Sequence, residues 1–103
     1  MNNYVFLYYT TRDMADKPDE SAKKAYMDWF EGLGDKLVDA GNPFNTNSKA
    51  ISKDGVMDVK DMPAGGYSIV KAGSMDQAID IAKSCPIMEA PGGTVCVYET
   101  MPM

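Results

Sequence analysis

The chain has 103 residues and a net charge of −5, and 45% of its residues are hydrophobic against 24% charged. This is the balance of a single folded domain, here residues 1–103, rather than of a disordered or fibrous chain. The ten basic residues form no patch that would neutralise several phosphates, so we expect no nucleic acid partner. The absence of histidine excludes Ser-His and Cys-His nucleophile pairs and imidazole metal ligands.

Residues 4–9, YVFLYY, are rich in aromatic and β-branched side chains and predict the first strand. Apolar side chains occupy both odd and even positions of this stretch, so we expect both faces of the strand to be buried. The apolar run is too short for a secretory signal or a membrane span. We therefore expect a cytoplasmic protein that makes no membrane contact.

A long helix is predicted next, from Pro18, which suits a first helical turn, to Ala40. Its apolar positions recur at spacings of three and four, as an amphipathic helix requires. They are Ala22, Tyr26, Trp29, Leu33, Leu37 and Ala40, with Phe30 and Val38 beside them. Gly41, followed by Asn42 and Pro43, should end the helix.

The middle of the chain predicts a hairpin, with a weak strand at 48–52, a turn at 53–55 and a returning arm at 56–59. The acidic residues Asp54, Asp58 and Asp61 lack the spacing of a calcium loop, and we expect no metal site. Residues 65–72 predict a further strand, and residues 92–99 predict the last one.

A second helix is predicted from about Met75, because Ser74 and Gln77 have the spacing of a capping box. Its apolar side should consist of Met75, Ala78, Ile79 and Ala82. Pro86 cannot continue this helix, which leaves Cys85 at its C-terminus, where the helix dipole disfavours a thiolate. We interpret Cys85 as a small core residue rather than a reactive thiol.

The predicted order of strand, helix, strand, strand, helix and strand is that of ferredoxin-like α+β folds, in which two helices cover one face of an antiparallel sheet. The predicted strands nevertheless carry apolar residues on both faces. Because no further strands remain to cover the second face, we expect a second copy of the chain to cover it in a homodimer.

With these elements in place, the whole chain resembles the YCII-related family of small dimeric α+β barrels. The stretches that carry the resemblance are MDWFEGLGDKLVDAGNPF, DGVMD, GGYSIVKAGSMDQAIDIAKSCP and GGTVCVYETMPM. The resemblance implies a ferredoxin-like protomer whose sheet packs against its twofold mate. Some relatives use a His-Asp pair, but this chain has Ile87 where many relatives have a histidine after Cys-Pro. Asp61 takes the place of the aspartate in the family's Asp-Gly-Pro-Phe loop.

These observations favour a homodimeric, non-catalytic module that binds a small molecule or has a regulatory role, without a cofactor. We expect the ligand beside the first helix, between it and the sheet or the central hairpin, in contact with Asp61, Trp29, Tyr8 and Tyr67. The alternative is a lyase or isomerase that uses Asp61 as base and Tyr8 or Tyr67 as acid. A catalytic Asp61 would be partly buried with a raised pKa, whereas a turn aspartate would be exposed.

Overall fold

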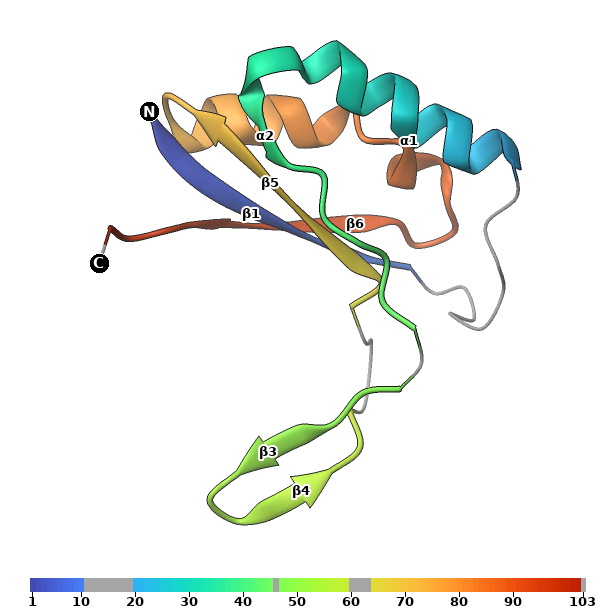
Figure 1. Cartoon of the computed structure of the whole chain (residues 1–103), viewed down its shortest axis with the longest axis vertical. Helices are drawn as coiled ribbons and strands as arrows, with labels where there is room; N and C mark the ends of the chain where they lie inside the picture. Colours follow the sequence, from blue (N-terminus) through green and yellow to red (C-terminus); the bar gives the residue numbers. More distant parts are fainter. Residues whose placement is uncertain (11–19, 46, 60–63, 103) are drawn as a thin grey trace.

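A computed structural model describes residues 1–10, 20–45, 47–59 and 64–102, with the backbone alone at 20–22 (Figure 1). The chain begins with β1 (Asn2–Tyr9), α1 (Glu20–Leu33), a 3₁₀ turn η1 (Gly34–Lys36) and β2 (Leu37–Asp39). A hairpin of β3 (Ala50–Ser52) and β4 (Gly55–Met57) follows. The chain then continues through β5 (Gly66–Ala72), α2 (Met75–Lys83), a second 3₁₀ turn η2 (Pro86–Glu89) and β6 (Thr94–Glu99).

The main sheet has four strands in the order β2-β5-β1-β6, and each neighbouring pair is antiparallel. The strands that are adjacent in space are therefore not consecutive in sequence, as the crossing helices of a split βαβ motif require. The β3–β4 hairpin forms a separate two-stranded sheet. The predicted ferredoxin-like α+β fold is thus confirmed.

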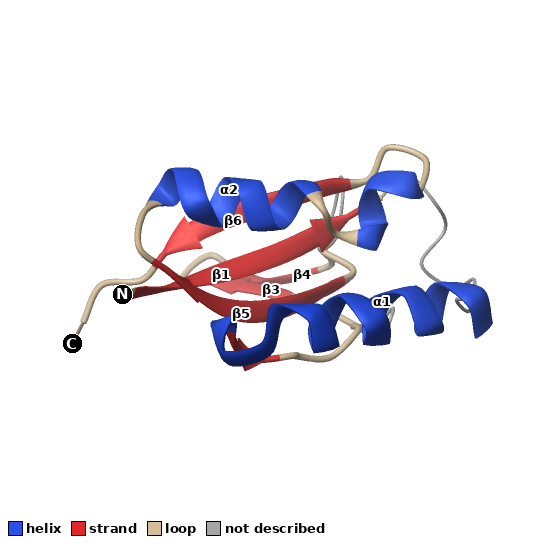
Figure 2. Ribbon diagram, turned by 90° about the horizontal axis from the view of Figure 1, so that it is seen from above, coloured by secondary structure: helices blue, strands red, loops and turns tan. Residues whose placement is uncertain are grey.

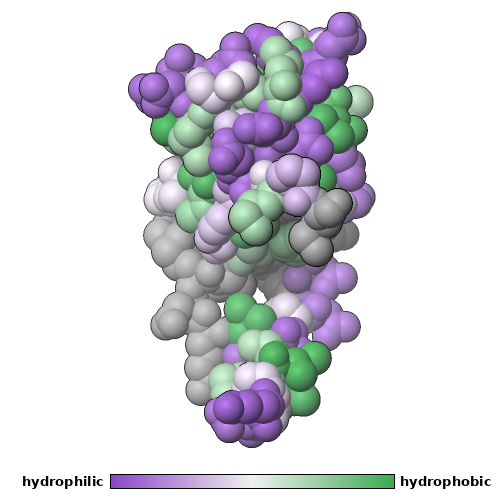
Figure 3. All heavy atoms as spheres, turned by 90° about the vertical axis from the view of Figure 1, so that its left-hand side faces the viewer, coloured by the Kyte–Doolittle hydropathy of each residue, from purple (hydrophilic) through white to green (hydrophobic). Residues whose placement is uncertain are grey.

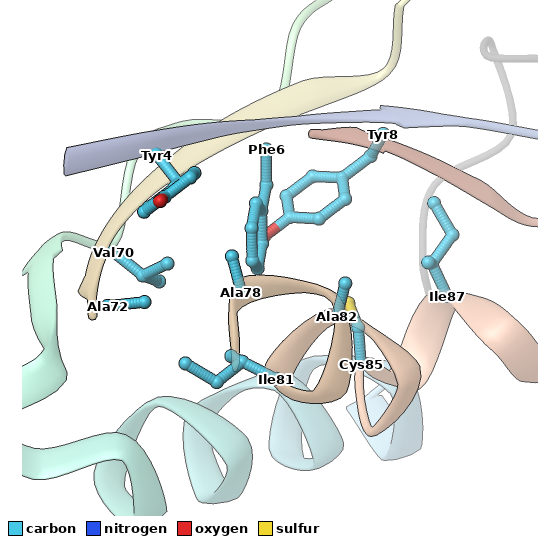
Figure 4. Packing of buried hydrophobic residues seen from close by; sticks show 10 residues of the cluster. All are labelled: Tyr4, Phe6, Tyr8, Val70, Ala72, Ala78, Ile81, Ala82, Cys85 and Ile87. Carbon is cyan, nitrogen blue, oxygen red and sulfur yellow. The ribbon is translucent and has the colours of Figure 1, made fainter. Parts of the chain in front are cut away.

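Both helices cover the same face of the main sheet, which lies beneath them in Figure 1. Tyr4, Phe6 and Tyr8 point from β1 toward α2 and are buried (Figure 4). The buried core is completed by residues of β5, α2 and η2 and by Cys85 between α2 and η2; these residues are Val70, Ala72, Ala78, Ile81, Ala82, Cys85 and Ile87. Because side chains alternate between the two faces of a strand, only every second residue of β1 can belong to this core.

The first helix is shorter than predicted. The sequence predicts helix up to Ala40, but α1 ends at Leu33 and residues 37–39 form β2. Gly34 adopts a positive φ of 55°, which a glycine just past the end of a helix commonly does. Leu37 then pairs with Val70 of β5. Pairing of Leu37 with the sheet therefore overrides the helical spacing of the apolar residues. The predicted start of the helix, at Pro18, lies outside the described residues.

Gly41 is required where β2 passes into the loop before the hairpin. Its φ is 76°, and a Cβ added there would lie 1.7 Å from the Tyr67 carbonyl oxygen. The backbone of this loop thus lies directly against β5, as the hydrogen bond from Tyr67 N to Asn42 O at 3.3 Å also indicates. The glycine predicted to end a helix instead permits close contact between two segments of backbone.

The second helix begins at Met75 as predicted, and the Ser74 side chain accepts a hydrogen bond from Gln77 N at 3.2 Å. Its predicted apolar side is partly wrong. Ala78 and Ala82 are buried, but Met75 and Ile79 are each 38% exposed and Ile81 is buried in their place. Because only one stripe of the helix contacts the sheet, these two apolar positions outside that stripe face solvent.

The predicted central hairpin is present as β3 and β4, with Ile51 directly opposite Val56. Among the described residues, no helix is both long and apolar enough to cross a membrane.

Candidate functional site

The structure separates the residues predicted to form one ligand site. Tyr8 points toward the helices and Trp29 lies on α1, so both belong to the covered side of the sheet. Tyr67 lies on the other face, because it is opposite Leu7 in the register of β1 and β5. Asp61 lies outside the described residues. Tyr8 and Trp29 therefore belong to one candidate site, and Tyr67 belongs to another surface.

Tyr8 is the most unusual polar group on the covered side. The residue is only 7% exposed, and its hydroxyl has no hydrogen-bond partner among the described residues. The neighbouring Ser68 hydroxyl donates instead to the Ala40 carbonyl at 2.7 Å. Buried hydroxyls almost always have a partner, because leaving one unpaired costs about 1–3 kcal/mol. The Tyr8 hydroxyl is therefore available to a bound water or ligand.

An aromatic layer on α1 lies next to Tyr8. The rings of Tyr8 and Tyr26 meet edge to face with centroids 6.1 Å apart. Phe30 lies 6.1 Å from Tyr26 and 5.3 Å from Trp29, again between ring centroids. Tyr26, Trp29 and Phe30 are only half-buried, so this layer connects the buried Tyr8 with solvent.

Trp29 also fixes the position of α1 relative to the end of α2. Its indole Nε1 donates to Ser84 Oγ at 2.9 Å, and Ser84 Oγ in turn donates to the Ile81 carbonyl at 2.8 Å. Trp29 thus combines ring packing with a hydrogen bond between two helices, as a half-buried indole typically does.

Cys85 completes a small group of titratable side chains with Tyr8 and Tyr26, which we call the hydroxyl–thiol cluster. Cys85 is 2% exposed, and burial raises the pKa of its thiol, while the polar groups around it, first of all the Ile87 backbone N–H, oppose this increase. At neutral pH the thiol therefore keeps its proton. This direction agrees with the sequence-based expectation that Cys85 is not an activated nucleophile.

The two tyrosines of the cluster also keep their protons. Burial strongly raises the pKa of Tyr8 and of Tyr26, and the proximity of Cys85 adds to the increase for both. A phenol with a raised pKa is a poor proton donor in acid catalysis but remains a hydrogen-bond donor. The cluster is therefore chemically suited to hold a polar group through neutral hydrogen bonds.

The second surface is the face of the sheet that the helices leave uncovered, which we call the open face. Leu7 has Tyr67 opposite it on β5 and Cys96 opposite it on β6, and directly opposed residues share a face. The apolar and aromatic residues of the open face are Val5, Leu7, Tyr9, Tyr67, Ile69, Cys96 and Tyr98, and the polar residues Asn3, Lys71 and Thr94 lie at its ends. Phe44 extends it by stacking on Tyr67, with ring centroids 5.8 Å apart.

Tyr26, Cys85 and Phe44 contribute to these two surfaces but were not predicted as site residues. Tyr26 was predicted only as part of the apolar stripe of the first helix, and Cys85 only as a helix end. Phe44 follows Pro43 in a loop, where no periodic pattern of apolar residues could have indicated its role. The spacing of Tyr26 three residues before Trp29 was the available signal for the aromatic layer.

Acidic side chains do not assemble a metal site in the part of the chain that is described, since no three His, Cys, Asp or Glu residues come together there. The donors that do converge are phenols and a protonated thiol.

A ferredoxin-like sheet, with helices on one face and an apolar open face on the other, defines a small α+β protein of the ferredoxin-like class. Within that class the chain belongs to the YCII-related family, because the family model for the YCII-related domain matches residues 2–103. A search of curated proteins found no match to the chain.

Proposed function

We propose that this member of the YCII-related family is a homodimeric binding or regulatory module that binds a small molecule without converting it. The observation that carries the proposal is the apolar open face of the sheet. The residues of this face are partly exposed, and Tyr98 is 56% exposed. A partly exposed apolar face of this kind marks an interaction surface, and an antiparallel sheet that is apolar on both faces needs a second layer.

The surface area of the chain supports a second copy as that layer. The chain exposes 7271 Å², whereas a compact monomer of its 11.2 kDa mass exposes about 5,700 Å². The projecting β3–β4 hairpin contributes to this excess of roughly 1,600 Å², and obligate homodimers bury surface of this order. The radius of gyration of 14.5 Å likewise exceeds the value of about 13 Å expected for a compact domain of this length.

The hydroxyl–thiol cluster supports binding rather than turnover. Tyr8 offers a buried hydroxyl that no described residue satisfies, and Tyr26 and Trp29 form a half-buried aromatic wall beside it. Ligand sites are typically apolar with a few polar groups that orient the ligand. Cys85 is not ionised at neutral pH, and no histidine is available as a base, so the described cluster contains no activated nucleophile.

The proposal is tested by identifying the small molecule that the natively purified protein retains, using native mass spectrometry. Its affinity is then measured for the wild type, for Tyr8→Phe and for Tyr98→Phe, which removes a hydroxyl that is not in the cluster. Loss of one neutral hydrogen bond should weaken binding by about fivefold in Tyr8→Phe. An affinity that responds neither to Tyr8→Phe nor to Trp29→Phe would rule out this site.

A further inference from the structure

The β3–β4 hairpin carries apolar side chains that the rest of the described chain does not cover. Ile51 and Val56 are directly opposite each other, so they share one face of the hairpin. The two residues are 78% and 66% exposed, respectively. Met57, on the other face, is 52% exposed. Each strand has only three residues, and a two-stranded hairpin of this size is marginally stable in water by itself.

The hairpin lies on the same side of the main sheet as the open face. In Figure 1 the helices lie above the main sheet and the hairpin lies well below it. Figure 2, viewed from the helix side, shows the hairpin behind β1 and β5. In Figure 3 hydrophobic atoms gather on the hairpin at the bottom of the view, on the side that faces left in Figure 1. A layer packed on the open face would therefore lie beside the apolar surface of the hairpin.

The charge of the hairpin is compatible with a second copy of this acidic chain as that layer. Lys49 and Lys53 balance Asp54 and Asp58 within residues 48–59, whereas the whole chain has a net charge of −5. The ion pair between Lys49 and Asp58 further neutralises the base of the hairpin. A neutral, apolar hairpin approaches an acidic surface without charge repulsion.

We infer that the β3–β4 hairpin is an arm that packs on the second copy of the chain in the dimer, burying Ile51 and Val56 against it. The inference rests on the proposed dimer through the open face. Each protomer contributes one arm, because a twofold interface uses the same surfaces of both copies. The arm gains from its partner the packing that its own chain does not provide.

The test compares dimer dissociation constants by sedimentation velocity. The variant Ile51→Thr with Val56→Thr keeps β-branched side chains and removes the apolar contact, so the hairpin conformation is preserved. Met27→Gln, on the outer side of α1 where the side chain is 67% exposed, serves as the control. The double variant should raise the dissociation constant at least about tenfold, because two apolar side chains lose their burial. The control should match the wild type.

An unchanged dissociation constant in the double variant would overturn the arm and leave the open-face dimer intact. A wild type that is monomeric would overturn the dimer itself, and the arm with it. Hydrogen exchange of the unmodified protein gives a second readout. Amides of residues 50–57 should be protected at concentrations where the dimer forms and should lose that protection on dilution. Fast exchange of these amides at all concentrations would contradict the arm.

Discussion

Tyr4 and Tyr8 are four residues apart on the same face of β1, yet only one of their hydroxyls has a partner among the described residues. Tyr4 Oη donates to Glu99 Oε1 at 2.7 Å, whereas Tyr8 Oη has no such partner in the described part of the chain. The two side chains thus form a natural matched pair, because both rings are buried and they differ in how the hydroxyl is satisfied.

Removing each hydroxyl should have opposite consequences for stability. Tyr8→Phe removes an unpaired buried hydroxyl, so the free energy of unfolding should stay equal or rise by up to about 1 kcal/mol. Tyr4→Phe removes a hydrogen bond to a carboxylate and should lower the unfolding midpoint. Urea denaturation of both variants checks the pair. A loss of stability in Tyr8→Phe as large as that in Tyr4→Phe would show that the Tyr8 hydroxyl is satisfied.

The hydroxyl–thiol cluster should make the protein lose stability in alkaline solution. The pKa of Cys85 is raised above its usual 9.0, and those of Tyr8 and Tyr26 above 10.0. The unfolded chain therefore releases these protons first as the pH rises. Their contribution to stability is complete below pH 9 and is lost above it, by up to about 1.4 kcal/mol per pH unit for each group.

Urea unfolding between pH 7 and pH 11 measures this dependence. The Tyr8→Phe and Cys85→Ala variants should each lose stability less steeply above pH 9 than the wild type. Tyr98→Phe, outside the cluster, is the control. If stability fell equally steeply with pH in the wild type and in both cluster variants, burial would not be raising the pKa of these groups.

Cys85 should be nearly inert to alkylation at neutral pH. Its thiol is buried and its pKa is raised, and only the thiolate is nucleophilic. In a Cys96→Ala background, labelling by iodoacetamide at pH 6.5 should be more than about tenfold slower than for a free thiol. Labelling in urea should then recover the full stoichiometry. Rapid stoichiometric labelling of the folded protein would identify Cys85 as a reactive residue.

Two glycines should respond in opposite ways to alanine. Gly41→Ala places a Cβ 1.7 Å from the Tyr67 carbonyl oxygen at a φ of 76°, so it should destabilise the protein by more than about 2 kcal/mol. Gly32 lies in α1, and a Cβ added there would meet no neighbouring segment within 4 Å. Gly32→Ala should stabilise by about 0.5–1 kcal/mol. Thermal unfolding of the two variants shows whether glycine is required at position 41 but not at position 32.

The sequence predicted the strands well where alternation was regular. In β1 the two apolar faces follow directly from residues 4–9, because side chains alternate strictly along a strand. The same reasoning failed at β2. Leu33 and Leu37 have helical spacing, and only pairing with β5 places Leu37 in a strand. A three-residue strand at the edge of a sheet carries too little local pattern to be distinguished from the end of a helix.

The candidate site was less predictable than the fold. Tyr8 and Tyr67 both lie in predicted strands, but their separation to opposite faces depends on the register between β1 and β5, which sequence spacing alone does not determine. The grouping of Tyr8 with Tyr26 and Cys85 brings together residues from β1, α1 and the end of α2. The role predicted for Asp61 stays a prediction.

The central claim is that the open face is covered by a second copy of the chain. Leu7 lies in the middle of that face, between Tyr67 and Cys96, and points away from the core. Leu7→Asp should therefore leave the protomer folded while placing a charge in the interface, which is costly to bury unpaired.

The most direct measurement is the molar mass from multi-angle light scattering at micromolar concentration, for the wild type and for Leu7→Asp, with circular dichroism to confirm folding. The wild type should have twice the 11.2 kDa mass of one chain, and folded Leu7→Asp should have the mass of one chain. A wild type at 11.2 kDa, or a folded Leu7→Asp that remains fully dimeric, would contradict the account.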